Sequence, residues 1–137
     1  MPVKVVDASA LAALLFGEPE AETAATKLES STLAAPALLP FEMASVCVKK
    51  LRRHPEQREA ILTAYALMDR LAIEYFQVQL SEVIALAERS KLTVYDAAYL
   101  WLAQSLRAEL VTLDASLAKA SRLKQKYRKG RRHPPSS

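Results

Sequence analysis

Short apolar runs and longer segments of helical periodicity alternate along the chain. The apolar runs predict strands at 3–6, 32–35, 73–78 and 110–113. The periodic segments predict helices at 8–16, 20–30, 40–53, 56–71, 81–90, 94–108 and 115–123. The first and last runs are apolar almost throughout, which is typical of strands covered on both faces in a parallel sheet. The alternation predicts an α/β fold of three layers, with a small central parallel sheet between helices.

Local signals refine this prediction. Pro40 suits the first position of a helix, and Ser81 and Thr93 suit N-caps. The only glycines are Gly17 and Gly130. No glycine-rich phosphate loop can be built from them, so a nucleotide-binding fingerprint is excluded.

Composition indicates an ordinary globular protein of one domain. The 137 residues are 51% hydrophobic and 25% charged. A single cysteine, Cys47, excludes an internal disulfide framework and fits a reducing cytoplasm. We see neither a targeting segment nor an apolar run near the about 18 residues that span a membrane. The sequence therefore predicts a cytoplasmic protein without membrane contact.

The net charge of +4 is distributed unevenly. Seven of the 19 basic residues lie in 122–137, where there is no acid, which leaves 12 basic and 15 acidic residues in 1–121. We therefore expect a domain at 1–123 and a basic, flexible tail at 124–137. Such a tail is either a solvated chain end or a contact for nucleic acid, and the sequence leaves both open.

Four acids interrupt otherwise apolar stretches: Asp7, Glu42, Asp96 and Asp114. Each has a local interpretation. Asp7 and Asp114 suit N-caps, Asp96 completes a capping box with Thr93, and Glu42 lies in a first helical turn, where the dipole favours an anion.

A shared role for the four acids is the alternative. Asp7 and Asp114 end apolar strands, and the carboxyl ends of parallel strands form the ligand crevice of open α/β sheets. Carboxylates crowded into one crevice disfavour each other's ionisation unless a cation compensates. The pattern therefore favours a divalent cation site built by all four.

The acids lie in blocks that carry a resemblance. Segments 5–11, 40–42, 92–99 and 110–114 resemble, in order and approximate spacing, the conserved blocks of PIN-domain nucleases. Within that family the chain is most similar to VapC-like toxins of type II toxin–antitoxin pairs. The resemblance covers about residues 3–123, and Tyr95-Asp96-Ala97-Ala98-Tyr99 is its sharpest piece.

The resemblance implies a metal-dependent endoribonuclease in which Asp7, Glu42, Asp96 and Asp114 bind Mg²⁺ or Mn²⁺ and carry the catalysis. It further implies that Ser9 and Thr112 support the site, although local turn and cap hydrogen bonds explain both hydroxyls equally well. A cognate antitoxin protein and a homodimer are implied as partners. Hard cations prefer oxygen ligands, and a metal-bound water can attack phosphorus.

Two departures from the family pattern matter. Relatives usually end with an apolar strand, whereas here Leu123 leads directly into basic residues. We therefore expect the sheet to lack that edge strand or a partner to supply it. Ser116 stands where some relatives have a further acid or amide, so one metal ion is expected rather than two.

Basic residues suggest how RNA would bind. Lys49 and Arg53 follow Glu42 by seven and eleven residues, which returns them to the same helical face. An ordinary solvated helix end explains them equally well. In the tail, Lys124, Lys126 and Arg128 are the RNA-binding candidates. We assign the aromatic residues Tyr95, Tyr99 and Trp101 to core packing.

Other functions stay open. A PIN nuclease of RNA processing or decay, or a catalytically silent RNA-binding PIN module, would have the same sequence features. An aspartyl-phosphate phosphatase or receiver domain would need a second acid near Asp7, where Ser9 stands. Nothing in the sequence identifies the RNA target.

Overall fold

Four parallel strands form the central sheet of the protein. The computed structural model describes the backbone of residues 1–130 and the side chains of residues 1–123. The strands are β1 (Val3–Val6), β2 (Thr32–Pro36), β3 (Glu74–Phe76) and β4 (Glu109–Val111). They are hydrogen-bonded in the order β3-β2-β1-β4, with all pairs parallel. All four predicted strands are confirmed, although β3 is shorter than the predicted 73–78. Within residues 1–130 no strand follows β4.

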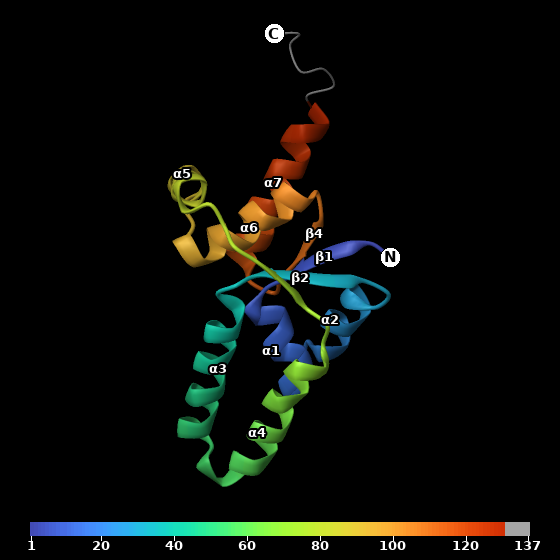
Figure 1. Cartoon of the computed structure of the whole chain (residues 1–137), viewed down its shortest axis with the longest axis vertical. Helices are drawn as coiled ribbons and strands as arrows, with labels where there is room; N and C mark the ends of the chain where they lie inside the picture. The colour runs from blue at the N-terminus through green and yellow to red at the C-terminus, as the bar shows by residue number, and fades with distance from the viewer. Residues whose placement is uncertain (131–137) are drawn as a thin grey trace.

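Helices cover both faces of this sheet. The α-helices are α1 (Ala8–Phe16), α2 (Ala21–Leu28), α3 (Leu39–Arg53), α4 (Arg58–Ala66), α5 (Leu80–Ser90), α6 (Val94–Leu106) and α7 (Ala115–Gly130). Figure 1 shows α1 to α4 below the sheet and α5 to α7 above it, with α3 and α4 extending away as a pair. The predicted three-layer α/β/α architecture is confirmed.

The core lies between β1 and the helices that pack on its two faces. Val5 and Val6 are fully buried, as an apolar strand covered on both sides requires. On one face α6 contacts β1, β2 and β4, and its Ala97 and Ala98 are buried. Small side chains allow this helix to approach the sheet closely, which brings its first turn to the carboxyl end of the strands.

Several helix ends differ from the predicted ones. The predicted helix 56–71 is broken into a 3-10 turn (Pro55–Gln57), α4 and a second 3-10 turn (Leu67–Arg70). Ser81 is not an N-cap, because α5 begins one residue earlier and its first amides bond to the Gln79 carbonyl. Pro40 is the second residue of α3 rather than the first. Thr93 is confirmed as the N-cap of α6.

The last helix is longer than predicted. It continues through Gly130, whereas the sequence predicted an end at 123. The side chains of Lys124, Lys126 and Arg128 lie outside the described residues, as does the whole segment 131–137, so the domain boundary at 123 stays a prediction. In the part of the chain that the structure describes, no helix combines the length and apolar character that a bilayer span requires.

Candidate active site

The pairing of β1 with β4 brings Asp7 and Thr112 together. Val6 pairs with Val111, so the next residue of each strand emerges at the same carboxyl edge. Asp7 is only 5% exposed, and Thr112 Oγ1 donates a hydrogen bond to its Oδ2 atom. The register of two short strands thus creates a buried carboxylate at the point where the chain crosses from one side of β1 to the other, which is where ligands bind in open α/β sheets.

Short polar side chains hold the Asp7 carboxylate in place. The backbone N–H of Ala10 and the hydroxyl of Ser9 donate to Asp7 Oδ1 at 3.0 and 2.7 Å, so Asp7 is the N-cap of α1. Ser9 Oγ also accepts from the Leu113 amide at 2.9 Å. Ser9 and Thr112 therefore both contact Asp7 and tie it to the loop that follows β4.

The same loop positions Asp114. Its backbone N–H donates to Thr112 Oγ1 at 3.0 Å. Its Oδ2 atom accepts from the Leu117 amide at 2.8 Å, which is the contact of a residue that caps α7. The Thr112 hydroxyl thus donates to the Asp7 carboxylate and accepts from the Asp114 backbone N–H.

Glu42 and Asp96 come from the first turns of α3 and α6. The Tyr99 hydroxyl donates to Glu42 Oε1 at 2.5 Å. Asp96 is partly buried, and its backbone N–H donates to Thr93 Oγ1 at 3.1 Å, the N-cap bond of α6. Both carboxylates lie at the positive end of a helix dipole, which favours negative charge.

The four carboxylates lie close enough to perturb one another. Burial raises the pKa of Asp7, and the nearby charge of Asp114 adds to it. Burial likewise raises the pKa of Glu42, with further contributions from Asp96 and Asp7. For Asp96, burial again raises the pKa most, followed by the charges of Asp114 and Asp7. The fold thus brings the four predicted acids into one electrostatically coupled cluster.

Hydrogen bonds offset the effects of burial and repulsion only in part. Thr112, Ala10 and Ser9 lower the pKa of Asp7, and the Tyr99 hydroxyl lowers that of Glu42, yet both pKa values stay raised. Among the described residues, no lysine or arginine contributes to the pKa shift of these carboxyls. The cluster therefore holds negative charge that the described side chains do not neutralise.

The chemistry of this cluster fits a hard divalent cation. All four side chains offer carboxylate oxygens, which Mg²⁺ and Mn²⁺ prefer, and a cation would offset the repulsion between their negative charges. No three His, Cys, Asp or Glu side chains in the described chain are already arranged as direct metal ligands. A bound Mg²⁺ usually keeps several waters, so part of the contact with these carboxylates would pass through water.

The structure does not bring Lys49 and Arg53 to the acids. They share a cavity of about 310 Å³ with Lys50 and Glu18, and none of the four acids lines it. With a rise of about 1.5 Å per residue, they lie roughly 10 and 16 Å from Glu42 along the axis of α3. The periodicity placed both on one face correctly, but that face leads away from the acid cluster.

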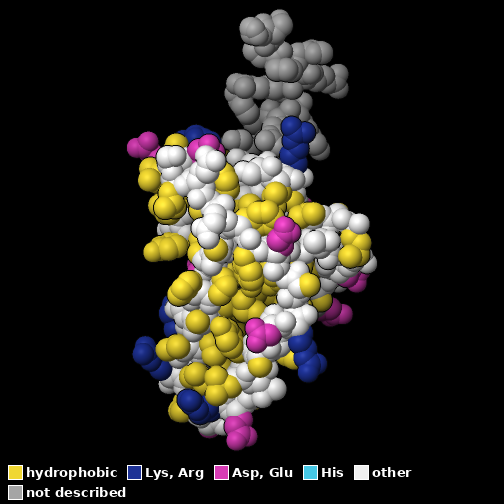
Figure 2. Space-filling view, in the orientation of Figure 1, with side chains coloured by type: hydrophobic (Ala, Val, Ile, Leu, Met, Phe, Trp, Pro, Cys, Tyr) yellow, Lys and Arg dark blue, Asp and Glu magenta, His cyan; other side chains and the backbone are white. Residues whose placement is uncertain are grey.

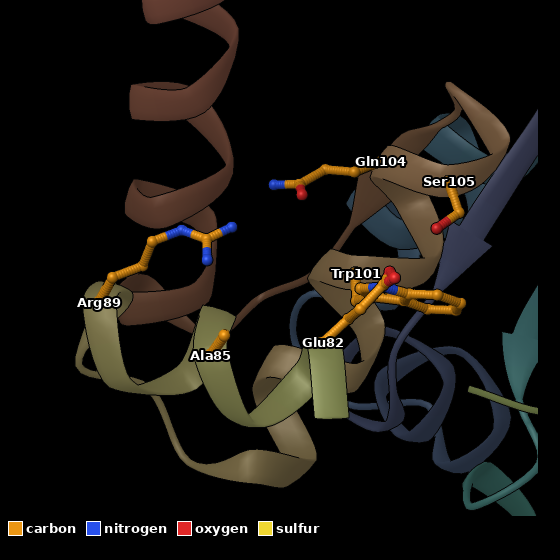
Figure 3. A pocket seen from close by; sticks show the side chains of 6 residues that line it. All are labelled: Glu82, Ala85, Arg89, Trp101, Gln104 and Ser105. Atoms are coloured by element: carbon orange, nitrogen blue, oxygen red, sulfur yellow. The ribbon is translucent and has the colours of Figure 1, made fainter. Parts of the chain in front are cut away.

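A second cavity lies between α5 and α6. It encloses about 360 Å³, and its lining includes Trp101, Glu82, Arg89 and Gln104. In Figure 3, Glu82 reaches the Trp101 indole, whose N–H donates to the Glu82 carboxylate at 2.8 Å. The Arg89 and Gln104 side chains extend toward the same space. Trp101 packs partly against the core, as predicted, and the cavity contains none of the four acids.

The assignment of Tyr95 to the core was wrong, and Tyr99 makes a contact that the sequence did not predict. Tyr95 is 63% exposed, because it lies in the first turn of α6, beyond the core. Tyr99 is 1% exposed and belongs to the core as predicted, but its hydroxyl also reaches the site. Burial and the nearby carboxylates raise the pKa of Tyr99, so the phenol keeps its proton and stays a donor. Its spacing of one helical turn from Asp96 was the available signal.

Comparisons with known proteins show the family of this chain. Residues 4–123 match the PIN domain family. The chain belongs to the PIN-domain family. As a PIN-domain protein it is similar to "Ribonuclease VapC3" of Pyrobaculum aerophilum, with 35% identity over 124 aligned residues. The alignment covers 83% of this chain and 91% of that protein.

A solved structure shows the same PIN-domain fold. The crystal structure of PAE2754 from Pyrobaculum aerophilum aligns with a TM-score of 0.71 and 27% sequence identity. The alignment covers 88% of this chain and 85% of that chain. The architecture of this VapC-like PIN domain is therefore shared over nearly the whole length of both chains.

Proposed function

We propose that this PIN-domain protein is a divalent-metal-dependent endoribonuclease that hydrolyses RNA phosphodiester bonds. The observation that carries the proposal is the cluster of four carboxylates, in which burial and the charges of neighbouring acids raise the pKa of Asp7, Glu42 and Asp96 with no contribution from a lysine or arginine among the described residues. A site of this kind attracts a cation. The similarity of the chain to a protein named as a ribonuclease supports RNA as substrate.

In this proposal Asp7, Glu42, Asp96 and Asp114 hold one Mg²⁺ or Mn²⁺ ion. When bound, the ion would make a water more acidic and offset the negative charge that develops at phosphorus. The Asp7 carboxylate has a fixed orientation, because its two oxygens accept hydrogen bonds from the Ser9 and Thr112 hydroxyls and from the Ala10 backbone N–H. Ser9 and Thr112 act by holding Asp7 and the loop before Asp114.

The RNA strand would contact basic side chains outside the cluster. Lys49 and Arg53 lie farther along α3, and Lys124, Lys126 and Arg128 follow in α7. Contacts to phosphates position a strand without reading its sequence. A strand that crosses the acid cluster and continues along α3 would place one phosphate at the cation and others near Lys49 and Arg53.

The similarity to a VapC protein supports a role as the toxin of a toxin–antitoxin pair, acting in the cytoplasm, with an antitoxin and a second copy of the chain as partners. Figure 2 shows apolar side chains gathered over the face that α3 and α4 present. A cavity of about 220 Å³ beside these helices is lined by apolar residues, Phe16, Ala60, Ile61 and Ala64, and by polar residues, Lys50, His54 and Gln57. An apolar patch with polar residues at its rim suits a protein partner.

Cleavage of labelled single-stranded RNA tests the proposal. We expect Mg²⁺ or Mn²⁺ to support cleavage and EDTA to abolish it. Asp7→Asn should remove cleavage while leaving the fold intact by circular dichroism. As a matched control, Asp69→Asn replaces an acid of the second 3-10 turn and should keep full activity.

Two results would refute the proposal. Cleavage by the wild type that persists in EDTA and is equal in Asp7→Asn would show that the acid cluster does not catalyse it. RNA binding without cleavage in either metal would instead indicate a silent RNA-binding PIN module.

A further inference from the structure

One hydrogen bond joins the two helices that supply Glu42 and Asp96. Tyr99 lies on α6 one turn after Asp96, and its hydroxyl donates to Glu42 Oε1, 57 residues away in the chain. The Tyr99 side chain is among the largest that are fully buried. Its ring is therefore fixed by core packing, and only the hydroxyl reaches the acid cluster.

Asp7 and Glu42 differ in how many hydrogen bonds hold their carboxylates. Asp7 is held by two hydroxyls and one backbone amide. Among the described residues, the Glu42 carboxylate accepts a hydrogen bond from Tyr99 alone. A glutamate has three rotatable side-chain bonds, so without this contact the carboxylate would sample several directions.

We propose that Tyr99 is a positioning residue, which holds the Glu42 carboxylate in the direction that serves a cation in the acid cluster. This inference rests on the proposed function, because it assumes that Glu42 is a metal ligand. The bond occupies Oε1 and leaves Oε2 without a protein donor among the described residues. One oxygen is thus anchored, and the other is available to the cation or to its water.

The chemistry of the donor supports this role. A lysine or arginine at this place would orient Glu42 but would also neutralise its charge and compete with the cation. A phenol orients the carboxylate and carries no charge. Groups that orient metal ligands in this way commonly change metal affinity about 10- to 100-fold when they are removed.

Direct Mn²⁺ binding to the full chain, measured by calorimetry without RNA, tests the inference. Tyr99→Phe keeps the ring in the core and removes only the hydroxyl. We expect its Mn²⁺ affinity to fall about tenfold. The matched control is Tyr65→Phe, which removes a hydroxyl from a partly buried tyrosine of α4 and should leave Mn²⁺ affinity unchanged. Thermal melts in EDTA verify that both variants are folded.

A double-mutant cycle with Glu42→Gln tests whether Tyr99 affects Mn²⁺ affinity through Glu42. If Tyr99 acts through Glu42, then Tyr99→Phe should cause no further loss of Mn²⁺ affinity in the Glu42→Gln background. An equal loss in both backgrounds would overturn the inference. So would a Tyr99→Phe protein that melts at a lower temperature but keeps the wild-type affinity, because the hydroxyl would then only stabilise the fold.

The same data separate this inference from the proposed function. Asp96→Asn serves as the variant with a damaged site. If the wild type binds Mn²⁺ no better than Asp96→Asn, the proposed metal site fails, and the role of Tyr99 fails with it. If the wild type binds more tightly than Asp96→Asn while Tyr99→Phe binds as the wild type does, only the role of Tyr99 is wrong.

Discussion

Replacing Asp96 by asparagine removes one negative charge, which belongs both to the acid cluster and to the first turn of α6. Loss of the favourable dipole interaction alone would destabilise the protein by about 0.3–1 kcal/mol. Against this, burial raises the pKa of Asp96, and the charges of Asp114 and Asp7 raise it further. Asp96 in turn adds to the rise that burial causes in the pKa of Glu42. Because the pKa is raised on balance, the folded state without metal disfavours the Asp96 charge.

We therefore expect the variant to melt at the same temperature as the wild type in EDTA, or higher. The carboxyl is partly exposed and screened, so the gain is at most about 1 kcal/mol. For a domain of this size that corresponds to roughly 4 °C.

Mn²⁺ should reverse the order of the two melting temperatures, so that the wild type melts at the higher one. A ligand at 100 times its Kd stabilises the native state by about 2.7 kcal/mol, and at ten times its Kd by about 1.4 kcal/mol. If Asp96→Asn weakens Mn²⁺ binding tenfold, its metal-induced shift in melting temperature should be about half that of the wild type. RNA cleavage should fall by orders of magnitude.

Melts of both proteins in EDTA and in Mn²⁺ provide the assay. Glu22→Gln is a suitable control, because it removes a charge from the first turn of α2 outside the cluster. It should lower the melting temperature slightly in both conditions and leave the metal shift unchanged. If Asp96→Asn behaves as this control does and keeps its activity, Asp96 has only a local role in α6, and the argument for a four-acid site is wrong.

Three further predictions concern the same site and the tail. Thr112→Val should destabilise the metal-free protein by about 1–3 kcal/mol in denaturant titrations, because it removes a buried donor to Asp7 and an acceptor for the Asp114 amide, whereas Thr112→Ser should recover most of the stability. The pKa values of Asp7, Glu42 and Asp96 are raised from ordinary values of 3.8 and 4.5, so their contribution to stability is full below about pH 4 and is lost as pH rises through the raised values. The melting temperature of the metal-free wild type should therefore fall with rising pH more than that of Asp96→Asn, and saturating Mn²⁺ should abolish the difference. Equal pH profiles of the two metal-free proteins would contradict the crowding of the acids. Replacing Lys124, Lys126 and Arg128 by serine should reduce the slope of log affinity for single-stranded RNA against log salt by about 0.7 for each phosphate that these side chains neutralise, and an unchanged slope would show that they do not bind RNA.

Local signals predicted most of the fold correctly. The run 3–6 followed by Asp7 contains both a strand and the cap of the next helix, and both are confirmed, because each depends on neighbours in sequence. The break within 56–71 was missed, since its helical pattern is continuous and only the local hydrogen bonds reveal the 3-10 turns.

The site could be predicted only in part. The four acids could be singled out because each interrupts an apolar stretch, and the pairing of β1 with β4 places Asp7 and Asp114 at the same edge of the sheet. Their shared role in catalysis stays a prediction. Tyr99 was missed as a site residue because its partner, Glu42, lies 57 positions away and no periodicity links them. The role of Lys49 and Arg53 in RNA binding stays a prediction, because periodicity gives the face of a helix, but the direction in which α3 leaves the sheet is a tertiary property.

The pairing of β1 with β4 has a consequence for synthesis on the ribosome. β1 is made first, but its partner on one side is complete only at Val111, and the Thr112–Asp7 bond spans 105 positions in the chain. Contacts of such sequence separation form late, since most of the chain must be present before the loop can close. A nascent or prematurely released chain that stops before β4 has Asp7 and Glu42 but lacks Thr112 and Asp114. If the proposed function is correct, only nearly complete chains can be active, and fragments from interrupted translation should be inert.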